Sequence, residues 1–199
     1  MIKNIVMDMG NVLLDYNPDA ALDIFFDNEE DKALIKKELF LGYEWIEADK
    51  GTITNAQKFE GVSRRVPKRL HKQLKACVEG WDVCMVPLPG AKEFCDFIKE
   101  QGYKLYVLSN ASDNIYKYFK NFADFEYLDG IVVSADVHMI KPDVRIYKYF
   151  MEKYDLVPEE CFFVDDRKDN VEGAKAAGMN AIVFKNDFES IKRVLWEMQ

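Results

Sequence analysis

The sequence has few of the residues that usually carry histidine or cysteine chemistry. Its 199 residues include two histidines and four cysteines. His71 and His138 lie far apart and no two cysteines form a CxxC pair, so neither a zinc site nor a Ser-His-Asp set is indicated. We expect the cysteines to be buried, reduced and structural, because they lie among apolar residues: Cys77, Cys84, Cys95 and Cys161. Catalysis must therefore depend chiefly on carboxylates, hydroxyls and lysine.

The chain also lacks an excess of positive charge and a long apolar run. Its formal net charge of −8 and its pI near 4.9 argue against general nucleic-acid binding, because phosphate backbones select for basic surfaces. No apolar stretch approaches the length needed to span a bilayer, and the N-terminal MIKNIVMDMGN has no signal-peptide pattern. We therefore expect a cytoplasmic protein that binds neither nucleic acid nor membrane. Its oligomeric state is not indicated.

What the chain does have is a regular alternation of strand-like and helix-like segments. A hydrophobic content of 49% is enough for a substantial core. Short apolar runs predict strands at 2–7, 105–109, 131–134, 161–164 and 181–184. Amphipathic spacing predicts helices at 91–102, 143–155, 168–178 and 188–198. The alternation predicts an α/β fold with a Rossmann-like parallel sheet in three α/β/α layers.

Residues 19–86 interrupt this alternation. Their segments have helical spacing and no convincing strand, and turn-rich joints flank them at Asn17-Pro18 and at Pro87-Leu88-Pro89-Gly90. We therefore expect an inserted α-helical cap at 17–87 and a catalytic core formed by 1–16 and 88–199.

The cap is the expected source of substrate selectivity. Its segment 42–54, GYEWIEADKGTIT, contains the turn that we expect to reach over the mouth of the site. Four aromatic residues could face the substrate, although packing among the cap helices is the commoner role: Tyr43, Trp45, Phe59 and Trp81. The basic run at 64–75 is interpreted as a solvated helix face, with attraction of an anionic substrate as the alternative.

Polar residues follow the strands at their carboxyl ends, where open parallel sheets bind ligands. Asp8 follows the first strand, although burying a carboxylate is costly unless its charge is compensated. The other strand ends contribute Ser109-Asn110, Lys141 and Asp165-Asp166. Each alone is explained by a turn or a helix cap. Together they suit phosphate and metal chemistry, with a carboxylate nucleophile, oxygen ligands for Mg²⁺ and donors for an anion.

With these motifs the chain resembles the haloacid dehalogenase superfamily. The motifs are VMDMGNVLLD, LYVLSN, the lysine of MIKPD and FFVDDRKDN, and the helical insertion is similar to the small cap of the first type in subfamily IA. The Asp-Asp and Gly-Asn-Val elements resemble the branch that holds bacterial sugar-phosphate phosphatases and the phosphatase domain of soluble epoxide hydrolase. The resemblance implies a Mg²⁺-dependent phosphatase that hydrolyses a small phosphomonoester, in the first place a sugar phosphate.

The resemblance also implies a role for each motif residue. Asp8 would attack phosphorus and form an aspartyl-phosphate that water hydrolyses. The phosphoryl oxygens would be held by Ser109, Asn110 and Lys141. The metal would be held by Asp8, the carbonyl of Gly10 and Asp166, with Asp165 and Asn170 as support. Between the two neighbouring acids, Asp166 is the expected metal ligand.

Gly10 departs from the family pattern. Phosphatases of the family usually carry a second Asp here, two residues after the nucleophile, as general acid and base. Losing a positioned acid and base typically costs ~10²–10⁴ in rate. Either the leaving group departs readily, or another acid acts, of which Asp15 is the nearest in sequence. For Asp15 we favour a role in pinning the loop that leads to the cap.

Two other functions compete with the phosphatase. A metal-independent 2-haloacid dehalogenase would also use Asp8, and family dehalogenases also lack the second Asp. The Asp165-Asp166 pair argues against it, because a negative cluster beside an anionic nucleophile needs a cation. A binding or regulatory protein without turnover is the third candidate, which Gly10 suggests. The presence of four motif residues argues against it: Asp8, Ser109, Lys141 and Asp166.

Overall fold

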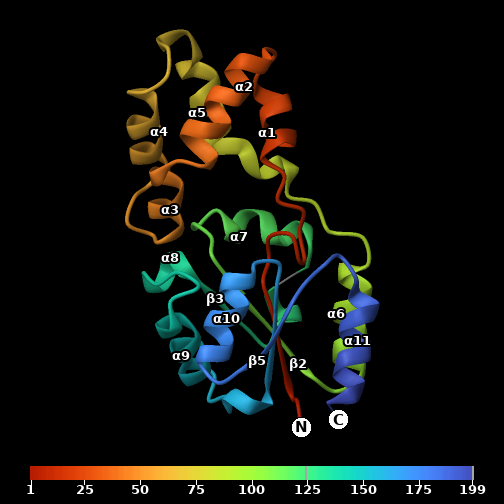
Figure 1. The fold of residues 1–199 in the computed structure, drawn as a ribbon. Coiled ribbons are helices and arrows are strands. Elements are labelled where there is room, and N and C mark those ends of the chain that lie inside the picture. The colour runs from red at the N-terminus through yellow and green to blue at the C-terminus, as the bar shows by residue number, and fades with distance from the viewer. Residues whose placement is uncertain (124, 199) are drawn as a thin grey trace.

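A parallel β-sheet forms the centre of the structure, a computed structural model that describes residues 1–123 and 125–198 (Figure 1). Its five strands have the order β3-β2-β1-β4-β5. They are β1 (Asn4–Met7), β2 (Lys104–Ser109), β3 (Gly130–Val133), β4 (Cys161–Asp165) and β5 (Asn180–Val183). The predicted parallel sheet is confirmed, and the predicted strand ends lie within two residues of the observed ones.

Helices cover both faces of the sheet, because side chains alternate between two cores along each strand. Ile5 and Met7 belong to one apolar cluster, whereas Val6 belongs to the other. The first cluster includes residues of α6 (Ala91–Glu100) and α11 (Phe188–Glu197), and the second includes residues of α9 (Val144–Lys153) and α10 (Lys168–Ala176). Figure 1 shows α6 and α11 together on one side of the sheet. The predicted three-layer arrangement is confirmed.

Strand register brings three chemically important strand ends together. Met7 at the end of β1 pairs with Val107 of β2 on one side and with Val164 of β4 on the other. Consequently Asp8, Ser109 and Asp165 lie at one edge of the sheet. The strand order reverses direction at β1, with β2 on one side of it and β4 on the other. Open α/β sheets bind ligands where the strand order reverses.

A group of helices lies beyond this edge of the sheet, at the top of Figure 1. Asn17 caps its first helix by accepting hydrogen bonds from the N–H groups of Asp19 and Ala20. The group comprises α1 (Pro18–Phe25), α2 (Glu29–Ile35), the π-helix η1 (Lys36–Phe40), α3 (Tyr43–Asp49), α4 (Asn55–Ser63), η2 (Lys68–Leu70), α5 (His71–Gly80) and η3 (Trp81–Cys84).

The two connections to this helical group run next to each other. Leu14 bridges Pro87 in antiparallel fashion, and the N–H of Asp15 donates to the carbonyl of Val86 over 2.8 Å. This pairing fixes the entry and the exit of the segment relative to the sheet. It also agrees with the favoured interpretation of Asp15 as a residue of the loop that leads to the cap.

Ion pairs within the helical group involve the basic run. Arg65 contacts both Glu38 and Glu44, and Arg69 contacts Asp31 in a two-pronged arrangement. Acids of the same helical group therefore neutralise these arginines. This agrees with the interpretation of the basic run as a solvated helix face.

Short helices complete the chain: α7 (Ile115–Tyr118), η4 (Phe119–Asn121), η5 (Phe125–Tyr127), α8 (Ser134–Val137) and η6 (Pro158–Glu160). All four cysteines are free and buried, which confirms the structural role expected for them. Among the helices of the described residues, none combines the length and apolarity that a membrane span requires.

Candidate active site

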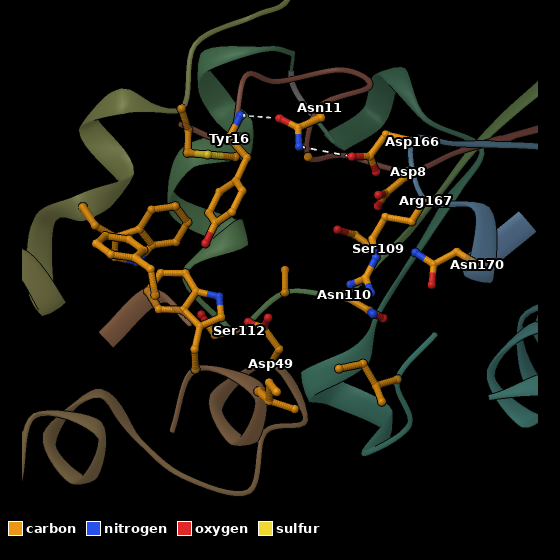
Figure 2. Close-up of a pocket in the computed structure, with 18 of the residues that line it drawn as sticks. Asp8, Asn11, Tyr16, Asp49, Ser109, Asn110, Ser112, Asp166, Arg167 and Asn170 are labelled. Carbon is orange, nitrogen blue, oxygen red and sulfur yellow. Dashed lines mark hydrogen bonds between the residues drawn. The ribbon is translucent and has the colours of Figure 1, made fainter. Parts of the chain in front are cut away.

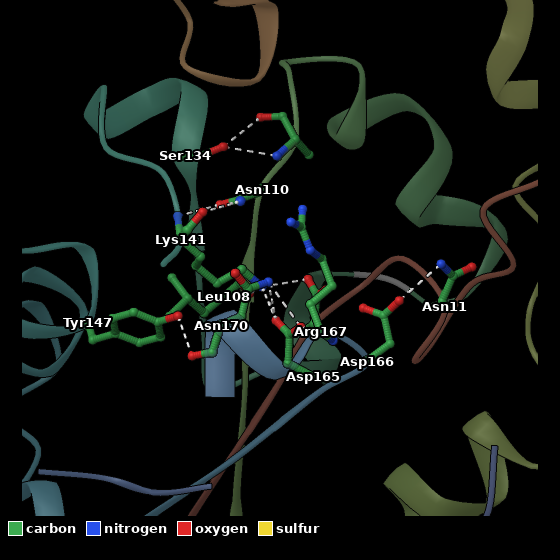
Figure 3. A network of polar contacts seen from close by, with 12 residues as sticks. Asn11, Leu108, Asn110, Ser134, Lys141, Tyr147, Asp165, Asp166, Arg167 and Asn170 are labelled. Carbon is green, nitrogen blue, oxygen red and sulfur yellow. Dashed lines mark hydrogen bonds and ion pairs between the residues drawn. The ribbon is translucent and has the colours of Figure 1, made fainter. Parts of the chain in front are cut away.

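A buried ion-pair network joins three strand ends. The side chain of Lys141 is completely buried, and its Nζ lies 2.8 Å from Asp8 Oδ1 and 2.7 Å from Asp165 Oδ2. The same ammonium group donates to the carbonyl of Leu108 at the end of β2, over 2.7 Å. Figure 3 shows Lys141 with two of its partners, Leu108 and Asp165. One lysine therefore compensates two carboxylates that would otherwise be buried without a partner.

The pKa values of Asp8 and Lys141 reflect the fact that one cation serves two buried carboxylates. Burial raises the pKa of Asp8 to about 7, although Lys141 lowers it. Burial alone would lower the pKa of Lys141, but Asp165 and Asp8 outweigh this effect and raise it above its ordinary value. Lys141 is thus protonated at neutral pH, whereas Asp8 needs further positive charge to be fully ionised.

Asp165 and Asp166 differ in how fully their oxygens are used. Asp165 accepts from Lys141, from the Asn170 amide at 3.0 Å and from the backbone N–H of Arg167 at 2.8 Å. Asp166 accepts from the Asn11 amide at 3.2 Å and lines a cavity. Burial raises the pKa of Asp166, while Asn11 lowers it. Asp165 thus organises the network, and Asp166 keeps carboxylate capacity for a ligand.

Asn11 supports the loop after Asp8. Its φ of 57° lies in the left-handed region, which asparagine tolerates better than most residues. Its side chain bridges two segments, since Oδ1 accepts from the Tyr16 N–H at 3.1 Å while Nδ2 donates to Asp166.

A cavity of about 380 Å³ lies over these strand ends (Figure 2). Asp8, Ser109, Asn110 and Asp166 contribute to its polar wall. Asn110 is held in place by two bonds to the backbone of Lys141, at 2.8 and 2.9 Å. The cavity therefore presents hydroxyl, amide and carboxylate groups together.

The opposite wall of the cavity is largely aromatic. Trp45 and Trp81 lie 4.9 Å apart between ring centroids, and Phe40 and Tyr16 pack against Trp45 at 4.8 and 6.1 Å. All four residues line the cavity. Of the aromatic residues predicted for the cap surface, Trp45 and Trp81 reach the site. Tyr43 is exposed, and Phe59 packs against the core.

Segment 42–54 reaches over the site, as predicted, and it brings a carboxylate with it. Asp49, the last residue of α3, lines the cavity and accepts a hydrogen bond from the backbone N–H of Ser112. Figure 2 shows Asp49 across the cavity from Asp8. Two contacts from the core hold this turn, because the Ser134 hydroxyl donates to the carbonyl of Asp49 and His138 Nδ1 lies 2.9 Å from the carbonyl of Lys50.

The donor set at the strand ends suits a hard divalent cation. One carboxylate oxygen from each of Asp8, Asp165 and Asp166 lies within 4.8 Å of the others. Only Lys141 compensates this cluster directly, and Asn170 Oδ1 is buried without a hydrogen-bond partner among the described residues. Carboxylate and amide oxygens are the ligands that Mg²⁺ prefers. The residues present therefore fit such an ion.

Comparison with known proteins identifies the family. A model of the haloacid dehalogenase-like hydrolase family matches residues 2–178. The chain belongs to this family. It is thus related to hydrolases along most of its length, and the predicted superfamily membership is confirmed.

The relatives that the chain resembles differ in what their names describe. A sesquiterpene phosphatase of Aspergillus oryzae is 25% identical over 89% of this chain and 87% of its own length. A phosphorylated carbohydrates phosphatase of Thermotoga maritima is 30% identical over 58% of this chain and 52% of its own length. A drimenol cyclase of Aspergillus calidoustus is 23% identical over 92% of this chain, but the match spans 34% of that enzyme.

A solved structure of the family matches nearly the whole chain. This enzyme of Bacteroides thetaiotaomicron, in complex with magnesium and inorganic phosphate, is 26% identical, with a TM-score of 0.73. The match covers 96% of this chain and 99% of that structure.

Most motif residues that the sequence singles out lie together in the structure. Asp8, Gly10, Ser109, Asn110, Asp166 and Asn170 line the cavity, and Lys141 and Asp165 lie beneath them. Asp15 does not line the cavity. Among the lining residues that the sequence did not single out are Asn11, Tyr16, Asp49, Ser112 and Arg167. Asn11 and Arg167 lie within the quoted motifs and Ser112 lies two residues after one, which was the available signal. Asp49 lies in the segment predicted to reach over the site, but nothing marked it within that segment.

Gly10 is not required by its surroundings. A Cβ atom built on it meets only Tyr16 Cβ at 3.6 Å, an ordinary van der Waals distance. Its backbone is not among the positive-φ positions. A Cβ atom would therefore fit at position 10, where phosphatases of this family usually carry aspartate.

Proposed function

We propose that the protein is a Mg²⁺-dependent phosphatase that hydrolyses a small phosphomonoester through an aspartyl-phosphate on Asp8. The observation that carries the proposal is the position of Asp8, which shares Lys141 with Asp165 and lines one cavity with Ser109, Asn110 and Asp166. This combination provides a nucleophile, anion donors and cation ligands at one strand edge.

In the proposed reaction each residue has a defined task. Asp8 attacks phosphorus, while the Ser109 hydroxyl and the Asn110 amide bind phosphoryl oxygens and the Lys141 ammonium group stabilises the negative charge from beneath the cavity. Lys141 is fixed by Leu108 and Asp165, so its charge needs no rearrangement as negative charge develops. Asp165, with Asn170, orients Lys141 and acts through it.

Asp8, the Gly10 carbonyl and Asp166 would hold the metal ion, with Asn170 as support. When bound, Mg²⁺ supplies positive charge that offsets the repulsion between Asp8 and a phosphate dianion. The raised pKa of Asp8 supports this requirement, because a neighbouring cation lowers the pKa of a carboxyl group and keeps the nucleophile ionised.

For the alcohol part of the substrate we propose a sugar, with the segment 17–87 as the cap that encloses it. The name of the Thermotoga maritima relative supports this class. Trp81 supports a hydroxyl-bearing group, since its indole Nε1 is buried and lacks a hydrogen-bond partner among the described residues. The aromatic wall with Trp45 and Phe40 also favours an apolar alcohol, and the Aspergillus oryzae relative is named for sesquiterpenes.

One assay tests the proposal against its rivals. Purified protein is offered p-nitrophenyl phosphate, sugar phosphates, farnesyl phosphate and 2-haloacids, with Mg²⁺ or with EDTA. We expect phosphate release that requires Mg²⁺ and is lost in Asp8→Asn, which keeps the shape of the side chain but removes the nucleophile. Equal activity in EDTA would contradict the metal assignment. Halide release would instead support a dehalogenase, and inactivity on the whole panel would support a binding protein.

A further inference from the structure

The proposed reaction lacks an acid where the family usually has one. Gly10 has no side chain, and Asp15 lies outside the cavity. In an in-line displacement the leaving oxygen lies on the far side of phosphorus from the attacking Asp8. A substitute acid would therefore lie on the wall of the cavity that faces Asp8, toward the helical segment.

Asp49 occupies that wall. It lies at the end of α3 and faces Asp8 across the cavity in Figure 2, with Ser109 and Asn110 lining the cavity nearby. The Ser134 hydroxyl donates to the backbone carbonyl of Asp49 and so holds the backbone in place. The Ser112 N–H donates to the Asp49 carboxylate and so orients the side chain. Asp49 is thus a positioned carboxyl group that the binding of Mg²⁺ and phosphate at the strand ends does not use.

We propose that Asp49 is the general acid for the leaving alcohol and then the general base for water, an inference that rests on the proposed phosphatase function. It places the proton shuttle on the cap rather than on the residue two positions after the nucleophile.

The proton and electron changes balance over the two steps. In the first, Asp8 forms a bond to phosphorus, the bond from phosphorus to the ester oxygen breaks, and that oxygen takes the proton of Asp49 to leave as the alcohol. In the second, water attacks phosphorus and gives a proton to the Asp49 carboxylate. The bond between phosphorus and Asp8 breaks, its electron pair returns to Asp8, and phosphate is released.

The electrostatic surroundings of Asp49 support this role. Burial raises its pKa to about 7, in spite of the lowering by Lys58 and by the Ser112 N–H. A carboxyl group with a pKa near the working pH gives and takes protons efficiently.

The test compares Asp49→Asn with wild type on two esters of similar shape, phenyl phosphate and p-nitrophenyl phosphate. Nitrophenolate leaves without protonation, whereas phenolate is a poorer leaving group. We expect the variant to lose ~10²–10⁴ in kcat on phenyl phosphate. On p-nitrophenyl phosphate it should keep a rapid burst of about one nitrophenolate per enzyme, followed by slow turnover, because the aspartyl-phosphate forms but water lacks its base.

Two further variants separate catalysis from folding or binding. Glu47→Gln removes a carboxylate from the same helix, where Glu47 contacts Lys50 and Thr52 outside the cavity, and should retain wild-type rates. Adding Gly10→Asp to Asp49→Asn supplies an acid where a Cβ fits and should restore turnover on phenyl phosphate at least tenfold.

The outcomes distinguish this inference from the function on which it rests. Wild type that releases no phosphate from any ester overturns the phosphatase proposal itself. Active wild type with an equally active Asp49→Asn overturns only the role of Asp49. A folded Asp49→Asn that loses the burst as well, and that Gly10→Asp does not rescue, also overturns it, because the residue would then serve binding or structure.

Discussion

The protonation state of Asp49 determines how its proposed function depends on pH. Lys58 of α4, Tyr16 and Tyr118 of α7 are the charged or titratable groups whose interactions involve Asp49, and Lys58 lowers its pKa. As an acid, Asp49 acts only when protonated. We therefore expect kcat/KM for phenyl phosphate to fall as pH rises through about 7.

Lys58→Met removes the neighbouring cation, so the pKa of Asp49 should rise and this decline should move to higher pH. Stopped-flow pH profiles of wild type and Lys58→Met provide the measurement. An unmoved or downward-shifted profile would contradict the assignment.

Lys141 should matter for stability as well as for turnover. Lys141→Met leaves Asp8 and Asp165 buried without their shared cation, and breaking such a pair typically costs about 3–5 kcal/mol. Because burial raises the pKa of Asp8 in the folded state, protonation favours folding, so the loss should be largest above pH 7 and smaller at pH 5.

Urea unfolding in EDTA at both pH values measures this loss. Lys104→Met is the matched control, because the exposed Lys104 contacts Asp129 at 2.8 Å at the surface, where solvent screens the ion pair, and its loss should be much smaller. Equal losses of unfolding free energy in the two variants would contradict a stabilising role for the buried ion pairs of Lys141.

At the scale of the elements, the strand ends and the segment over the site were predictable, but the position of the Asp49 side chain was not. Asp8, Ser109 and Asp165 meet because parallel register forces neighbouring strands to end at one edge, a rule that needs only the strand positions. The direction in which Asp49 points depends on how α3 packs over α8, which local periodicity does not determine. The sequence therefore placed segment 42–54 near the site without indicating that Asp49 faces the cavity.

The backbone of Gly51, two residues after Asp49, packs closely against Ala135 of α8. It has a φ of 68°, and a Cβ atom there would lie 2.2 Å from the carbonyl oxygen of Ala135. Gly51→Ala should therefore push the turn away from α8, displace Asp49 and lower kcat on phenyl phosphate more than tenfold. Gly102→Ala is the control, because Gly102 has a φ of 82° with nothing within 4 Å of a built Cβ.

Both glycine variants should lose about 1–2 kcal/mol for the left-handed backbone, but Gly102→Ala should keep its activity. Thermal unfolding and steady-state kinetics of the pair provide the measurements. Similar activities would mean that contact with Ala135 does not set the position of Asp49.

At the scale of the whole molecule, ligand binding should raise the free energy of unfolding. A ligand that binds only the folded state adds about 2.7 kcal/mol at a concentration 100 times its Kd. We therefore expect Mg²⁺ to raise Tm and inorganic phosphate to raise it further, with both shifts reversed by EDTA.

Asp166→Asn should abolish the Mg²⁺ shift because it removes a proposed ligand. Asp169→Asn, on the exposed first turn of α10, should keep the shift. A Mg²⁺ shift that survives in Asp166→Asn would move the metal site elsewhere.

The open space beside Gly10 has an evolutionary consequence. Two of the four glycine codons differ from an aspartate codon by a single base, and a Cβ at position 10 meets only Tyr16 Cβ at 3.6 Å. The backbone therefore accepts a Cβ at position 10 while an acid is present at position 49. A chain with acids at both positions could then lose either one and remain active, so that the general acid changes between the core and the cap during evolution.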